Sequence, residues 1–192
     1  MKAHRLAGRS RARAWSRGPR RGHLFGFVRL RLTARGLRPL AASIRVVTAR
    51  YFAYGSNMAL SRMRARAASA HPEGAARLPG FRLACDKLGV DGSGKANLRV
   101  DASAEVWGAL YTIETGDLAR LDAHEGGYDR VTVEVCWRDA IVAAHTYRST
   151  RTTRDPTPFA WYKRLVVEGA HEHGLPADWI LALEAWPERE GC

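Results

Sequence analysis

Alternating hydrophobic and polar positions predict several strands between residues 75 and 147. The clearest lies at residues 131–137, where Val131, Val133 and Val135 alternate with less hydrophobic neighbours, as expected of a strand with one buried face. A similar run at residues 141–147 is expected to be its hairpin partner. Further strands are predicted at residues 75–85, broken by Pro79-Gly80, and at residues 96–100 and 106–113.

Helices are predicted on both sides of these strands. One should begin near Met58, because Ser56 and Asn57 are residue types that favour N-caps. A second should be capped by Thr115 and end at Gly126-Gly127. Two more close the chain, one opening at Thr157-Pro158 and the other starting at Pro176. Strands dominate the middle and helices the ends, so the predicted class is α+β.

Charge divides the 192-residue chain into two parts. Residues 1–49 contain 13 Lys and Arg and no Asp or Glu, whereas the remaining residues contain 18 basic and 19 acidic side chains. The net charge of +12 therefore belongs to the first part. We expect residues 1–49 to be a basic, disordered extension and residues 50–192 to be one folded domain.

The basic extension has no apolar run long enough for a secretory signal or a membrane span. We favour a start of translation near Val47, with residues 1–46 as upstream sequence. An organellar transit peptide and a nucleic-acid-binding arm are the alternatives, because both are rich in arginine. Cys85, Cys136 and Cys192 show neither metal-ligand spacing nor an even framework. They fit a reducing compartment, and we expect a cytoplasmic protein.

The segment Tyr51-Phe52-Ala53-Tyr54-Gly55-Ser56-Asn57 joins a short predicted strand to a predicted helix. Its aromatic residues suit a strand, and Gly55 allows backbone geometry closed to other residues. Backbone N–H groups at such a turn converge on one point, which suits a carboxylate or an oxyanion. An ordinary strand-to-helix turn is the alternative interpretation.

Glu125 is the main catalytic candidate. In the second predicted helix, Leu118, Leu121 and Glu125 fall at i, i+3 and i+7, so the glutamate should face the same side as two leucines. A poorly solvated carboxylate there suits general-base catalysis. From spacing alone, a glutamate at an exposed helix end is the favoured interpretation. The segment His171-Glu172-His173 lacks the spacing of a zinc site, and we expect neither a metal nor a cofactor.

Several motifs in order resemble the γ-glutamylcyclotransferases, including their AIG2-like and γ-glutamylamine cyclotransferase members. These motifs are YFAYGSNM (51–58), EVWGALY (105–111), LDAHEGGY (121–128), Tyr147 and YKRLVVEGAHEHGLPADW (162–179). The resemblance covers residues 50–186. Asn57 distinguishes the chain from the glutathione-specific ChaC branch, which usually has leucine after YGS.

The resemblance implies a fold, an activity and site residues. The fold would be a small, twisted, mixed β-barrel with surrounding helices. Glu125 would be the catalytic acid and base, and the substrate would contact the seven residues of the segment 51–57 together with Tyr128 and Tyr162. From the residues alone, both tyrosines fit equally well as core aromatics. The reaction would convert a γ-glutamyl amino acid or amine into 5-oxoproline and the free amino acid or amine.

Two other functions remain open at this stage. One is a non-catalytic barrel that binds a small ligand through the same segment. The other is a nucleic-acid-associated protein that acts through the basic extension, although we expect no nucleic-acid partner for the folded domain. The expected assembly is a monomer or a homodimer. The leaving group is not specified by any motif.

Overall fold

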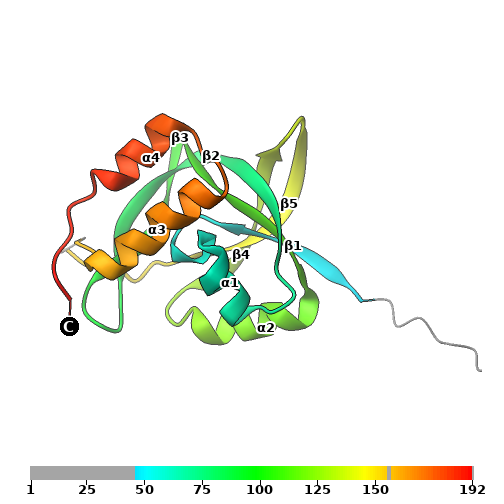
Figure 1. The fold of residues 1–192 in the computed structure, drawn as a ribbon, viewed down its shortest axis with the longest axis horizontal. Helices are drawn as coiled ribbons and strands as arrows, with labels where there is room; N and C mark the ends of the chain where they lie inside the picture. The colour runs from blue at the N-terminus through cyan, green and yellow to red at the C-terminus, as the bar shows by residue number, and fades with distance from the viewer. Residues whose placement is uncertain (1–45, 155–156, 192) are drawn as a thin grey trace, which may run out of the picture. The chain divides into compact units, whose positions relative to one another are not determined.

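The computed structural model describes residues 46–154 and 157–191 (Figure 1). The predicted extension, residues 1–49, therefore lies almost wholly outside the described residues. Its last two residues, Thr48 and Ala49, already belong to the first strand. The strands are β1 (Thr48–Ala53), β2 (His71–Leu88), β3 (Gly94–Glu114), β4 (Asp129–Trp137) and β5 (Ala140–Arg148). The helices are η1 (Ser56–Met58), α1 (Leu60–Arg66), α2 (Thr115–His124), α3 (Ala160–Glu172) and α4 (Ala177–Glu184).

The five strands close into a barrel in the order β1-β3-β2-β4-β5. Strand β1 pairs antiparallel with β3 and parallel with β5, so Tyr51 lies between Tyr111 and His145. The other pairs are antiparallel, which makes the barrel mixed. The structure thus confirms the predicted fold class, a mixed β-barrel with surrounding helices. Hairpin β4–β5 matches the alternating pattern from which it was predicted.

The two longest strands differ from their predictions. We predicted a strand that starts at residue 75 and is broken at Pro79-Gly80, and separate strands at residues 96–100 and 106–113. Instead, β2 and β3 each run unbroken and pair with one another along most of their length. Register shifts between Pro72 and Gly74 and between Pro79 and Phe81 let the strand bend without ending. Proline and glycine therefore mark bulges in this barrel.

The caps of the first two α-helices also differ from their predictions. Ser56 and Asn57 lie inside the 3-10 turn η1, and neither side chain caps a helix. Helix α1 begins one turn later, and its first N–H, that of Leu60, donates to the carboxylate of Glu172 at 2.7 Å. Thr115 is the first residue of α2, not its cap. Its backbone N–H donates to the carbonyl of Val47 at 2.9 Å. Contacts distant in sequence replace the local caps in both cases.

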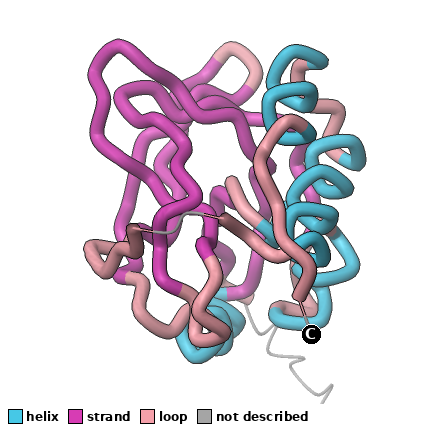
Figure 2. The backbone as a smooth tube through the Cα atoms, turned by 90° about the vertical axis from the view of Figure 1, so that its left-hand side faces the viewer, coloured by secondary structure: helices cyan, strands magenta, loops and turns pink. Residues whose placement is uncertain are grey.

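Most of the helical chain packs along one side of the strands, as Figure 2 shows. Helix α3 approaches η1 closely, since a Cβ on Gly169 would lie 2.4 Å from the backbone carbon of Met58 and 2.3 Å from the backbone nitrogen of Ala59. Only glycine permits this approach, which brings α3 against the turn that follows β1. Large buried side chains from both layers, including Phe52, Met58 and Tyr111, fill the core.

Membrane-spanning segments were also sought in the structure. Within residues 46–154 and 157–191, no helix is both long and apolar enough to cross a bilayer.

Candidate functional site

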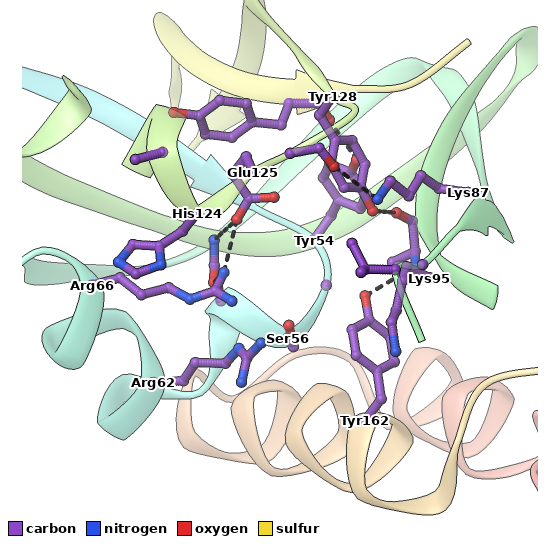
Figure 3. A pocket seen from close by; sticks show the side chains of 18 of the residues that line it. Tyr54, Ser56, Arg62, Arg66, Lys87, Lys95, His124, Glu125, Tyr128 and Tyr162 are labelled. Atoms are coloured by element: carbon purple, nitrogen blue, oxygen red, sulfur yellow. Dashed lines mark hydrogen bonds and ion pairs between the residues drawn. The ribbon is translucent and has the colours of Figure 1, made fainter. Parts of the chain in front are cut away.

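A cavity of about 540 Å³ opens where β1 gives way to η1. Its walls come from six parts of the chain: residues 51–57, helix α1, the β2–β3 hairpin, residues 123–128 around the end of α2, Tyr147 of β5, and α3 (Figure 3). The loop predicted from the sequence and the candidate base Glu125 therefore line the same cavity, although 68 residues separate Asn57 from Glu125.

The carboxylate of Glu125 is held from one side only. Its Oε1 accepts hydrogen bonds from Asn57 Nδ2 at 2.9 Å and from Arg66 Nη1 at 2.8 Å. Among the described residues, no group donates to Oε2. The side chain is 12% exposed and belongs to a residue on the cavity wall. The arrangement leaves one carboxylate oxygen available to exchange a proton with a bound molecule.

The surroundings of Glu125 differ from those expected. We expected two leucines beside it, but Leu118 and Leu121 turn into the core. Glu125 itself is the residue that ends α2, where the helical backbone geometry stops. Its side chain therefore leaves the helix in another direction and meets Asn57 and Arg66. The helical spacing was correct for the leucines and wrong for the residue at the helix end.

Asn57 connects residues 51–57, hereafter the signature loop, to the candidate base. Its Nδ2 donates to the Tyr51 hydroxyl at 2.8 Å as well as to Glu125, and its Oδ1 accepts from Arg66 Nη1 at 2.8 Å. These contacts fix both ends of the amide. Asn57 is therefore placed to orient the carboxylate, in addition to forming part of the cavity wall.

Residues 51–57 do not all reach the cavity. Tyr51, Tyr54, Gly55, Ser56 and Asn57 line it, whereas Phe52 and Ala53 lie in the core, with almost no exposed surface. Strand alternation explains part of this difference, because neighbouring side chains point to opposite faces. Phe52 and Ala53 thus contribute to packing, and we do not retain them as contacts of a bound molecule.

Gly55 is required because a side chain at this position has no space. We expected it to permit unusual backbone geometry, but its φ is −125°, outside the left-handed region. A Cβ there would lie 2.9 Å from the Cβ of Ala96 and 3.0 Å from the hydroxyl of Tyr162. The loop therefore packs directly against β3 and α3, and any side chain at residue 55 would displace one of them.

Five tyrosines line the cavity, of which four are buried and Tyr128 is partly buried: Tyr51, Tyr54, Tyr128, Tyr147 and Tyr162. Burial is the largest cause that raises the pKa of each phenol above its usual value. All five hydroxyls therefore remain protonated near neutral pH. They can donate hydrogen bonds, but they are unsuited to act as bases.

Three of these phenols already donate to the protein. Tyr54 donates to the carbonyl of Tyr147, Tyr128 to the carbonyl of Ala96 at 2.6 Å, and Tyr147 to Asp122 Oδ1 at 2.9 Å. Tyr51 and Tyr162 differ, because their hydroxyls accept hydrogen bonds from Asn57 and from the Ala96 N–H. Among the described residues, neither of these two protons has an acceptor. Tyr51 and Tyr162 are thus the phenols that can donate to a bound molecule.

Sequence analysis missed the positive charge of the cavity. Four cationic side chains line it: Arg62, Arg66, Lys87 and Lys95. The spacing of Arg62 and Arg66, four residues apart in a short helix, was a usable signal, because such residues share one face. The two lysines lie on either side of the β2–β3 turn, where they are paired directly across the two strands. Their convergence depends on the pairing of these strands.

His171, Glu172 and His173 each have a different partner. His171 lies 3.2 Å from Glu184, and Glu172 receives the first N–H of α1. His173 is half-buried, and its Nε2 lies 2.7 Å from the Tyr111 hydroxyl and 3.0 Å from the Met58 carbonyl. Glu172 and His173 therefore hold the end of α3 against the start of α1 and against η1.

Comparison with known proteins identifies the family. The AIG2-like family model matches residues 105–183. A γ-glutamylcyclotransferase of Bos taurus is 31% identical over 141 residues, which cover 67% of this chain and 73% of that protein. The chain belongs to the γ-glutamylcyclotransferase family. The Homo sapiens γ-glutamylcyclotransferase is likewise 31% identical over 145 residues, covering 70% of this chain and 77% of that protein.

The structural comparison agrees with the sequence comparison. A solved structure described as a γ-glutamyl cyclotransferase superposes with a TM-score of 0.71 and 27% sequence identity. The match covers 76% of this chain and 91% of that chain. The family resemblance inferred from the motifs is therefore confirmed, as is the fold that it implied.

Proposed function

We propose that this γ-glutamylcyclotransferase family member converts γ-glutamyl amino acids or γ-glutamyl amines into 5-oxoproline and the free amino acid or amine. The observation that carries the proposal is the one-sided hold on Glu125. Asn57 and Arg66 donate to its Oε1, no described group donates to Oε2, and the residue lines the cavity. A general base needs this combination of fixed position and open access.

The reaction is an intramolecular acyl transfer. Glu125 takes a proton from the α-ammonium of the glutamyl group, and the freed amine attacks the γ-carbonyl carbon of the same molecule. The new C–N bond closes a five-membered ring, and the carbonyl oxygen becomes an oxyanion. As the carbonyl re-forms, the original amide C–N bond breaks, and Glu125 returns its proton to the leaving nitrogen. The ring nitrogen gives its second proton to the regenerated Glu125 carboxylate, which passes it to the departing amine or to solvent. Two protons in all therefore leave the attacking nitrogen, and the 5-oxoproline ring keeps one N–H.

Two phenols are available to stabilise the substrate during this reaction. The hydroxyls of Tyr51 and Tyr162 line the cavity with protons that no described residue accepts. A neutral donor aimed at a developing oxyanion lowers the barrier, because the charge is larger in the transition state than in the bound substrate. Tyr162 also touches the signature loop, where a Cβ on Gly55 would meet its hydroxyl.

The glutamyl α-carboxylate would lie between the loop and Arg62. Arg62 lines the cavity, its guanidinium lies 5.8 Å from the ring centroid of Trp161, and its buried Nε has no hydrogen-bond partner. Burial and the neighbouring Arg66 lower the pKa of Arg62. The charged form of Arg62 is therefore disfavoured by its surroundings, and a bound carboxylate would stabilise it. Holding the substrate folded back on itself can contribute several kcal/mol to catalysis.

Release of 5-oxoproline tests the proposal. The purified protein is incubated with γ-glutamyl-alanine, ε-(γ-glutamyl)-lysine and γ-glutamyl-ethylamide, and 5-oxoproline is measured by mass spectrometry. The proposal expects release from at least one compound, and Glu125→Gln serves as the matched control. Binding of a γ-glutamyl compound without any release would instead establish a non-catalytic ligand-binding barrel.

A further inference from the structure

Among the described residues, two of the four cationic side chains of the cavity have an acidic ion-pair partner and two do not. Arg66 forms an ion pair with Glu125, and Lys95 Nζ lies 2.7 Å from Asp91 Oδ2. Among the described residues, neither Arg62 nor Lys87 has an acidic partner. The cavity therefore contains two cations that form no direct ion pair with the described residues, although the charge of Glu125 acts on both from a greater distance.

Lys87 is unusual for a lysine because only 5% of its surface is exposed. Its Nζ donates one hydrogen bond, to the carbonyl of Gly126 at 2.9 Å, and lies 4.8 Å from the ring centroid of Tyr128. An ammonium group has three N–H donors, so this single carbonyl leaves most of its capacity unused. Burial lowers the pKa of Lys87, and Lys95 and Arg151 act in the same direction, whereas the charges of Glu125 and Asp91 oppose the shift. A bound carboxylate would offset this cost.

Lys87 is also close to the proposed chemistry. Gly126, which receives its hydrogen bond, directly follows Glu125 in the chain. Figure 3 shows Lys87 on the side of the cavity opposite Arg62, with Tyr54 and Ser56 between them. The two unpaired cations thus face the cavity from different walls, one from α1 and the other from β2.

A γ-glutamyl-α-amino acid has two carboxylates, and a simple γ-glutamyl amine has one. We propose that Lys87 binds the carboxylate of the leaving amino acid and so selects γ-glutamyl-α-amino acids over γ-glutamyl amines. The inference rests on the proposed function. The leaving nitrogen must lie beside Glu125 to receive its proton, and the carboxylate of an α-amino acid is only two bonds from that nitrogen. Arg62, on the other wall, then remains for the glutamyl carboxylate.

A matched pair of substrates isolates this contact. γ-Glutamyl-alanine and γ-glutamyl-alaninamide have nearly the same shape, but only the first has a carboxylate on its leaving group. The ratio of kcat/KM for the two compounds is measured in the wild type, Lys87→Met, Lys95→Met and Arg62→Met. Because each ratio is taken within one protein, a smaller folded fraction cancels. The same ratio, measured as Kd by calorimetry in a Glu125→Gln background, gives a readout independent of turnover.

The wild type should prefer the carboxylate by roughly 10- to 100-fold, the range of a charge-assisted hydrogen bond. Lys87→Met should remove most of this preference by lowering kcat/KM for γ-glutamyl-alanine alone. Lys95→Met should keep the preference, because that ammonium is already paired with Asp91. Arg62→Met should lower kcat/KM for both substrates by the same factor.

Two results would overturn the inference. One is a Lys87→Met protein that keeps the wild-type preference, and the other is a loss that is equal for both substrates. The second would assign Lys87 to the glutamyl carboxylate or to support of Gly126. A wild type that releases 5-oxoproline from neither compound would refute the proposed function, and the Kd ratio would then decide whether Lys87 recognises the carboxylate.

Discussion

Nη1 of Arg66 lies 2.8 Å from Oε1 of Glu125, across a separation of 59 residues in the sequence. Both side chains are largely buried, and Asn57 bridges them. Removing the arginine would leave a buried carboxylate without its cation, which destabilises the folded protein and frees Glu125 to move. The pair is therefore expected to matter for both stability and turnover.

Arg66→Met should lower kcat/KM by on the order of 10-fold or more and reduce the melting temperature. The matched control is Arg64→Met, since Arg64 is an exposed arginine of the same helix, and its loss should change little. A double-mutant cycle with Glu125→Gln measures the coupling. Independent effects of the two substitutions on turnover would show that Arg66 does not position the base.

Glu125→Gln should greatly reduce turnover while preserving the fold. Glutamine keeps the oxygen that accepts from Asn57 and Arg66 but cannot take up the proton, so kcat should fall on the order of 10²-fold or more. Circular dichroism, the melting temperature and substrate binding should remain close to wild type. Near-normal release of 5-oxoproline by the folded variant would remove Glu125 as the base and direct attention to His124 or Asp122.

Gly55 should tolerate no side chain. A valine there would collide with Ala96 and with the Tyr162 hydroxyl, both within 3.0 Å of the added Cβ. We expect Gly55→Val to raise KM steeply or abolish binding, and Gly55→Ala to have a smaller effect, because one methyl group requires less displacement. Steady-state kinetics and a melting curve test this. Unchanged KM in folded Gly55→Val would mean that substrate does not use this loop.

His173 should make stability depend on pH. Burial lowers its pKa, although the Met58 carbonyl and Glu172 oppose the shift, so the unfolded chain takes up a proton at a higher pH than the folded one. The His173 contribution should therefore be largest above about pH 6.5, the usual pKa of histidine, and decline as the pH falls below it. Urea unfolding at pH 8 and pH 5 should show a smaller acid loss for His173→Gln than for the wild type. An equal loss in both proteins would contradict this.

The basic extension should be dispensable for the fold. A protein that begins at Val47 retains the carbonyl that accepts from the Thr115 N–H, and it should melt and turn over like the full chain. Beginning at Arg50 instead removes this contact and the first two residues of β1, so the melting temperature should fall. A clear loss of stability in the protein that begins at Val47 would show that residues 1–46 contribute to folding.

Local pattern was sufficient for some elements. Alternation identified β4 and β5, and helical spacing placed Leu118 and Leu121 on one face, which is buried in the structure, because burial of one face depends on the period of a single segment. The family motifs supplied the barrel and singled out Glu125. Bulges in β2 and the helix caps could not be predicted, because both depend on which strand or side chain lies opposite.

The sequence by itself therefore determined the family, the class of fold and the candidate base. Only the tertiary structure decided how Glu125 is held and where positive charge remains unpaired. Asn57 and Arg66 reach Glu125, and Lys87 reaches Gly126, across separations of 68, 59 and 39 residues. Side-chain contacts over such distances follow from barrel closure and from the packing of α1 beside α2, which no local periodicity encodes.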